Sequence, residues 1–227
     1  MSMKTSVIAY VYAIVAAAAA SLVGLYMYQP DVNVLFLAGA GWLTLVAFLG
    51  TVLSYRVQGS TFGAVSFIPF LTAFVLYPSW ATVVIVGTGA VIAEMIKPKM
   101  AIKRAFNVAQ IVLAGCFAIA VYMMLGGQPL LVNADFQALP HTSAVVVFLF
   151  VNTLAVAAVI GIAEGKSVIK IWYEGNSAGL VYDVVAIPVV YAFARAYVDW
   201  GGWGVAALCA LVIGLKFTYQ SKHQLET

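Results

Sequence analysis

Apolar runs of about twenty residues recur along this chain, and only short polar connections separate them. A run of that length crosses a hydrocarbon core of roughly 30 Å as a helix, because a helix satisfies its backbone polar groups internally. With 64% hydrophobic and 8% charged residues, the 227-residue chain has too few charges for an ordinary soluble domain. The sequence therefore predicts a single all-α integral membrane domain, a polytopic helix bundle with seven to eight transmembrane helices.

The apolar runs place the predicted spans in order along the chain. The third is expected to be short or broken, because Pro69 interrupts the apolar run that ends at Tyr77. Ser79 is a candidate N-cap for the fourth span, which is a little shorter than usual. Residues 164–179 predict an amphipathic interfacial segment, and 220–227 are expected to begin a cytoplasmic linker helix. The predicted spans are approximately 7–28, 34–55, 66–77, 80–95, 106–125, 143–163, 180–197 and 203–219.

A basic cluster between the fourth and fifth spans determines the predicted orientation. Four of the eleven basic residues, Lys97, Lys99, Lys103 and Arg104, fall within eight positions, and Lys and Arg are enriched in cytoplasmic loops. Alternating eight spans puts every basic residue except Arg195 on the side of this cluster. We therefore predict a multi-pass protein with both termini cytoplasmic, and we take the four cluster residues as its topology anchor.

The residues present disfavour several classes of function. The basic residues lie at the ends of apolar runs rather than along an exposed stripe, so we expect no nucleic-acid partner. Cys116 and Cys209 lie inside apolar runs without paired spacing, which argues against a disulfide framework or a zinc site. His141 and His223 stand apart from other metal ligands, and the sequence has no phosphate-binding loop, Cys-x-x-Cys or serine nucleophile motif. The sequence therefore predicts no catalytic residue, no metal and no cofactor.

Polar side chains inside the predicted spans are the candidate site. A central charge costs about 2.5 to 3.5 kcal/mol on insertion scales, so such residues usually pair or have a function. Asn107 and Gln110 share one helix face through their i, i+3 spacing, and Glu94 is spaced to pair with Lys97. For the amides, interhelical hydrogen bonding and ligand contact both stay open, while the helix dipole alone accounts equally well for Asp183. The polar residues are Glu94, Asn107, Gln110, Asn152 and Asp183.

A ligand pocket is expected beside the broken third span, since non-helical backbone at membrane depth is tolerated only when it is buried or faces a cavity. The third span, the fourth span and the start of the fifth are expected to line this pocket. Amides of the fifth and sixth spans would bind the polar head of a ligand, and an aromatic residue would close the apolar end. The candidate ligand-binding residues are Asn107, Gln110, Asn152, Asp183, Trp80 and Phe67.

Short segments in a fixed order carry a resemblance over about the last two-thirds of the chain: Val65–Pro69, Tyr77–Pro78, the basic cluster, Phe106–Gln110 and Tyr122–Gly127. In this order they resemble the membrane-embedded N-terminal region of bacterial HD-GYP and GGDEF-type cyclic-di-GMP signalling proteins. Gln220–Thr227 is similar to the start of the linker helix that joins such a region to a cytoplasmic output domain. No HD, GYP or GGDEF sequence follows, so the resemblance implies an input module without catalysis. Such regions also resemble the substrate-binding subunits, or S-components, of energy-coupling-factor vitamin transporters.

The resemblance implies a function and leaves two alternatives open. We expect a sensor or input module of the bacterial inner membrane that binds a small, largely apolar ligand or a membrane partner, and relays the change through its last span. The first alternative is an S-component-like subunit for small-molecule binding or transport. The second is a structural subunit of a larger membrane complex, which aromatic, glycine-rich and charge-poor spans allow. The expected partners are the lipid bilayer and either a second copy of the chain or another membrane protein.

Overall fold

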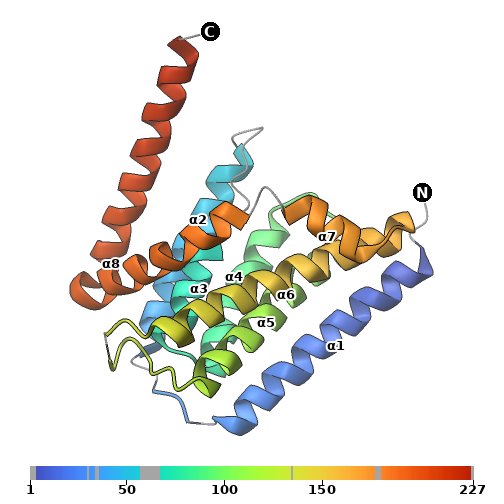
Figure 1. The fold of residues 1–227 in the computed structure, drawn as a ribbon, viewed down its shortest axis with the longest axis horizontal. Coiled ribbons are helices and arrows are strands. Elements are labelled where there is room, and N and C mark those ends of the chain that lie inside the picture. Colours follow the sequence, from blue (N-terminus) through green and yellow to red (C-terminus); the bar gives the residue numbers. More distant parts are fainter. Residues whose placement is uncertain are drawn as a thin grey trace.

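The regular structure in the described part of the chain is α-helical. The computed structural model describes residues 4–29, 31–33, 36–56, 67–133, 135–176 and 180–225, with side chains except at 50–56, 176, 180–183 and 212–225. These residues form eight helices and no strand, which confirms the all-α prediction (Figure 1). The helices are α1 (Thr5–Tyr28), α2 (Leu37–Arg56), α3 (Phe67–Leu76), α4 (Trp80–Met95), α5 (Ala101–Met124), α6 (Ala138–Glu164), α7 (Val168–Asn176) and α8 (Leu180–Leu225).

Four helical segments are long and apolar enough to cross a membrane, which indicates a membrane protein. They are Thr5–Tyr28, Ala101–Met124, Ala138–Glu164 and Val184–Leu211. Each exceeds the roughly 20 residues that a helix needs to cross a core of roughly 30 Å. The apolar parts of α2, α3 and α4 are shorter, at 10–17 residues. The predicted seven to eight spans would need these shorter helices as well.

Contacts between helix termini show that neighbouring helices run in opposite directions. At one end of the bundle, Lys4 Nζ donates to the carbonyl of Ala163 at 2.7 Å, so the start of α1 meets the end of α6. At the other end, the rings of Tyr26 in α1 and Trp80 in α4 pack edge to face with centroids 5.2 Å apart. We call the first of these two ends the basic end. It holds Lys4, the end of α4, the start of α5 and the end of α6.

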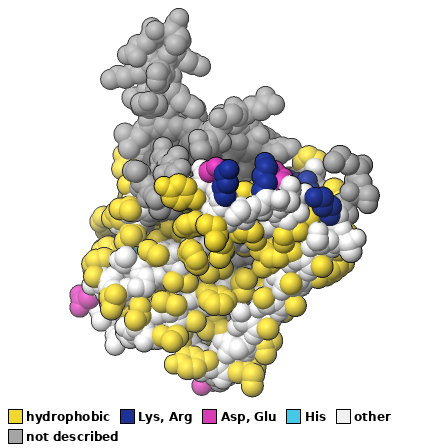
Figure 2. Space-filling view, turned by 45° about the vertical axis from the view of Figure 1, so that its right-hand side comes forward, with side chains coloured by type: hydrophobic (Ala, Val, Ile, Leu, Met, Phe, Trp, Pro, Cys, Tyr) yellow, Lys and Arg dark blue, Asp and Glu magenta, His cyan; other side chains and the backbone are white. Residues whose placement is uncertain are grey.

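Charged side chains are divided unevenly between the two ends. Figure 2 shows Lys and Arg side chains along one rim of the molecule, with hydrophobic side chains covering the surface below them. Towards the other end, the guanidinium of Arg195 pairs with Asp199 at 2.9 Å. This uneven division agrees with the positive-inside pattern on which the predicted orientation rests. The described basic side chains at the basic end are Lys4, Lys97, Lys99, Lys103, Arg104 and Lys166.

The short helix α3 contributes most of its residues to the core. All of its residues from Pro69 to Leu76 are buried, and the whole helix has 10 residues, so the third apolar segment is short, as predicted. Pro69 lies in the first turn, where its missing N–H leaves no intrahelical bond unmade. Pro69 therefore lies near the start of a helix rather than at a break in one. Residues 57–66, where the apolar pattern is weakest, lie outside the described residues. Gly115 of α5 lets Phe74 approach, since a Cβ there would lie 2.6 Å from the ring.

Two connecting segments are shorter than predicted. Helix α5 begins at Ala101 rather than at 106, so Lys103 and Arg104 lie on its first turn and not in a loop. Ala, Lys and Arg are good helix formers, and the turn around Pro98 sets the earlier start. Helix α6 begins at Ala138 rather than at 143.

In the predicted interfacial segment, α7 packs on α6, where Trp172 Nε1 donates to Thr153 Oγ1 at 2.9 Å.

Helix α8 consists of two arms that meet at Gly201. This residue has φ 60° and ψ −151°, a conformation that only glycine adopts readily. The two arms correspond to the separately predicted spans 180–197 and 203–219. The first arm packs on the core, where Val190 and Ala194 are fully buried. Just after the corner, the Gly202 carbonyl accepts a hydrogen bond from Trp42 Nε1 of α2 at 3.0 Å. Figure 1 shows the second arm leaving the bundle towards the C-terminus.

Candidate functional site

A buried carboxylate lies at the end of α4. Glu94 is the next-to-last residue of this helix, and its side chain is 8% exposed. Lys97 Nζ lies 2.7 Å from Oε1 of Glu94, and Lys99 Nζ lies 3.0 Å from Oε2. The predicted Glu94–Lys97 pair is confirmed, and the following turn adds Lys99 as a second partner. A buried carboxylate needs such partners, because an uncompensated charge away from water costs several kcal/mol.

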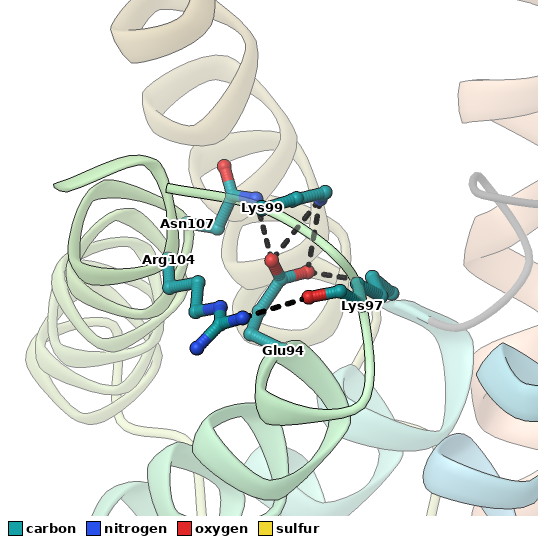
Figure 3. Close-up of polar contacts among 5 residues, drawn as sticks. All are labelled: Glu94, Lys97, Lys99, Arg104 and Asn107. Carbon is teal, nitrogen blue, oxygen red and sulfur yellow. Dashed lines mark hydrogen bonds and ion pairs between the residues drawn. The ribbon is translucent and has the colours of Figure 1, made fainter. Parts of the chain in front are cut away.

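The start of α5 completes the group of residues that we call the Glu94 cluster. Asn107 Nδ2 donates to Oε2 of Glu94 at 3.0 Å, across 13 positions of sequence. Arg104 Nη2 donates to the Lys97 carbonyl at 3.0 Å. Figure 3 shows the Lys97, Lys99 and Asn107 side chains converging on the carboxylate. The Glu94 cluster, which comprises Glu94, Lys97, Lys99, Arg104 and Asn107, therefore binds α4 to α5 and keeps more positive than negative charge.

The other predicted amides lie outside this cluster. Gln110 is 9% exposed on α5, and its Oε1 is buried without a hydrogen-bond partner among the described residues. Asn152 is half-buried near the middle of α6. Asn107 is thus engaged by protein, as the interhelical interpretation expects, whereas Gln110 keeps an unpaired acceptor one turn further along α5.

The predicted aromatic residues do not come together. Phe67 begins α3 and packs partly buried against the main core. Trp80 begins α4 after the turn at the far end of α3, where it contacts Tyr26. Because Phe67 and Trp80 lie at opposite ends of α3, they cannot close one small pocket jointly. The last candidate, Asp183, lies in α8, but its side chain is outside the described residues.

An open groove of about 620 Å³ lies between α1, α5 and α6 at the basic end. Its wall is mostly apolar. Val7, Val11 and Phe106 are buried in this wall, whereas Ile160 is 37% exposed at its edge. A groove of this size with an apolar wall can hold a small organic molecule or part of a larger one. The apolar lining residues are Val7, Val11, Met100, Ile102, Phe106, Val156, Val159, Ile160 and Ala163.

Lysine side chains and one amide form the rim of this groove, which we call the basic-rimmed groove. The rim residues are Lys4, Lys99, Lys103 and Asn107. Lys4 binds the Ala163 carbonyl, one of the last-turn acceptors of α6 that lack an intrahelical partner. Lys99 also belongs to the Glu94 cluster, whereas Lys103 has no ion-pair partner among the described residues. Positive charge therefore lies above an apolar wall.

The basic-rimmed groove involves different helices from the predicted pocket. The prediction used the third span, the fourth span and the start of the fifth, and of these the start of α5 lines the groove. Among the candidates whose side chains are described, Asn107 is the one at its rim. Sequence reasoning missed Lys4 and the α6 wall, because α1 and α6 meet across 159 positions of sequence. The available signal was Lys4 itself, a basic residue placed on the same side of the membrane as the 97–104 cluster.

A second, smaller groove lies between α1 and α5 towards the opposite end. It has a volume of about 350 Å³, and its described lining has no charged residue. Leu25, Phe117 and Met124 are among its lining residues. Such a surface suits contact with acyl chains. Of these two grooves, the one at the basic end combines apolar and charged groups in its lining.

The side chains around the basic-rimmed groove are of kinds that can contact a ligand. Ammonium groups, an amide and an apolar wall can hold and orient a ligand. Among the described residues, no group of three or more His, Cys, Asp and Glu side chains is placed to hold a metal ion. Comparisons of the chain with protein-family models, with curated proteins and with solved structures give no match.

Proposed function

We propose that this chain is the membrane-embedded input module of a bacterial signalling protein, which binds a small ligand or a membrane partner and relays the change to a cytoplasmic output. In this proposal it is a multi-pass bundle of seven to eight spans in the bacterial inner membrane, with both termini cytoplasmic. The basic-rimmed groove carries the proposal, because its volume of about 620 Å³ and its apolar wall with few polar groups are typical of a small-molecule site.

A route from the groove to α8 supports the relay. The groove is lined by the C-terminal half of α6, and the other end of the same helix contacts α8, where His141 Nε2 lies 3.1 Å from the Ile187 carbonyl. Helix α3 contacts the same arm, since Thr72 Oγ1 lies 3.4 Å from the Val190 carbonyl oxygen. A ligand that shifts α6 therefore acts on the first arm of α8, and Gly201 passes the change to the second arm.

The relay is tested by filling the groove and measuring the position of α8. Spin labels at I92C and L211C, in a background without Cys116 and Cys209, report the distance between α4, which does not line the groove, and the second arm, because Ile92 and Leu211 are 50% and 58% exposed. V156W fills the groove and should shift the distance distribution. The matched control is V146W, on an exposed position of α6 outside the groove, and it should leave the distribution unchanged.

Identical distributions for V156W and the parent protein would remove the relay from the proposal. A transporter subunit would instead show uptake of a small molecule that depends on a partner complex. A structural subunit would purify in fixed stoichiometry with other membrane proteins, and filling the groove would weaken that assembly rather than move α8.

A further inference from the structure

The rim of the basic-rimmed groove carries positive charge that the described residues do not neutralise. Lys103 has no ion-pair partner among them, and Lys4 binds a backbone carbonyl rather than a carboxylate. The neighbouring Glu94 cluster adds three cations and a single carboxylate. A ligand with an anionic head would complete the charge balance of this site.

The apolar wall continues downwards from this rim. Lys4, which directly precedes α1, and Val11 are seven residues apart, and Ala163 and Val156 are seven apart on α6, so the wall extends about 10 Å along the helix axes. Ile160 is 37% exposed at its edge. A small soluble anion would use the rim alone and leave this apolar surface uncovered.

We propose that the basic-rimmed groove binds an anionic phospholipid of the bilayer. The phosphate lies between Lys4 and Lys103, and the first part of an acyl chain follows Val7, Val156 and Phe106 into the groove. Basic pockets between membrane helices on the cytoplasmic side bind anionic head groups in this way. The inference rests on the proposed function in taking the groove as the input site, and it names the class of ligand that the site takes.

Lipid binding is measured directly on the purified chain in detergent. Phosphatidylglycerol and phosphatidylcholine with the same acyl chains are titrated separately, and retained lipid is counted by native mass spectrometry. We expect phosphatidylglycerol to be retained in preference to phosphatidylcholine. The K4Q/K103Q variant should weaken phosphatidylglycerol binding by about thirtyfold, because each lysine near an anionic head group contributes about 1 kcal/mol.

The matched control is K166Q/K170Q, which removes the same number of positive charges outside the groove. Lys166 pairs with Glu164 at 2.6 Å, and this hydrogen bond raises the pKa of Lys166, so the control lysine is charged at neutral pH. This control should change lipid binding by less than about twofold, since neither lysine lines the groove and both are exposed and already paired with a carboxylate, so that salt screens the charge they add. An equal loss in both double variants would reduce the effect to general surface charge and overturn the inference.

Two further outcomes also decide the question. Displacement of phosphatidylglycerol by inorganic phosphate at millimolar concentration would identify a soluble anion as the ligand, and equal retention of the two lipids would remove the head group from the interaction. If K4Q/K103Q fails to fold, K103Q alone serves, because this exposed lysine should still account for about a fivefold loss. The two proposals can fail separately. If the parent chain binds phosphatidylglycerol but V156W does not move α8, the lipid inference stands and the relay alone is refuted.

Discussion

Asn107 Nδ2 donates a hydrogen bond to Oε2 of Glu94 at 3.0 Å, and this contact joins the start of α5 to the end of α4. The acceptor is a buried carboxylate that also receives two lysine ammonium groups. Asn107 therefore contributes a donor to a charged group within the protein, and it has less freedom to turn towards a ligand than an unpaired amide would have. Its neighbour Gln110, on the same face of α5, has an Oε1 that is buried and unpaired among the described residues.

This difference predicts opposite effects for two similar substitutions. N107L should lower the free energy of unfolding by about 1 to 3 kcal/mol, because it removes a donor from a buried charged acceptor. Q110L should cause no loss and a gain of up to about 1 kcal/mol, because it replaces an unpaired buried amide by an apolar side chain. Thermal unfolding of the two variants in the same detergent measures both effects. Unchanged thermal stability of N107L would show that Lys97 and Lys99 alone compensate the buried charge of Glu94.

The contacts that the sequence predicts correctly are local. Ser79 caps α4, since its Oγ accepts from the Thr82 amide at 3.2 Å, and Glu94 pairs with Lys97. Both pairs are three positions apart, a spacing at which one turn of helix or its cap fixes the geometry. The all-α architecture follows from the same kind of local information, because apolar runs of spanning length form helices wherever they are packed.

The groove could not be predicted, because it depends on which sides of the long helices face one another. The buried residues of α1 are Val7, Val11, Ala18 and Leu25, yet the positions between them are mostly apolar as well. A helix that is apolar all round gives no pattern that identifies its packed face. The pairing of α1 with α6, and hence the meeting of Lys4 with Ala163, is set by tertiary packing alone.

Close packing of α2 on α4 gives a second prediction. A Cβ at Gly89 would meet Cγ2 of Thr44, a stiff β-branched side chain that is 8% exposed. G89A should therefore lower the free energy of unfolding by about 1 to 3 kcal/mol through overpacking. The control is G41A on α2, where a Cβ has nothing within 4 Å, and it should be neutral or stabilising by up to about 1 kcal/mol. Equal thermal stability of the two variants would show that α2 and α4 are not this close.

The corner of α8 gives a third prediction. G201A places a Cβ at φ 60° and ψ −151°, which should cost about 1 to 3 kcal/mol and favour a straighter connection between the arms. Spin labels at I92C and L211C should then report a changed distance between α4 and the second arm. G24A is the control, because a Cβ at Gly24 would meet no atom within 4 Å and the backbone there is ordinary helix. An unchanged distance in G201A would mean that the corner does not depend on glycine.

The last prediction concerns orientation in the membrane. The described basic side chains gather at the basic end, whereas exposed Asp135 lies in the connection between α5 and α6 at the opposite end. Basic segments stay on the cytoplasmic side, so a cysteine at Asp135 should face the periplasm and one at Lys166 the cytoplasm. In a background without Cys116 and Cys209, a membrane-impermeant maleimide should label D135C in cells whose inner membrane is intact. It should label K166C only after that membrane is opened. Labelling of D135C from the cytoplasmic side alone would invert the topology, and it would move the proposed lipid site to the outer leaflet, where the charge argument for a cytoplasmic anionic lipid no longer applies.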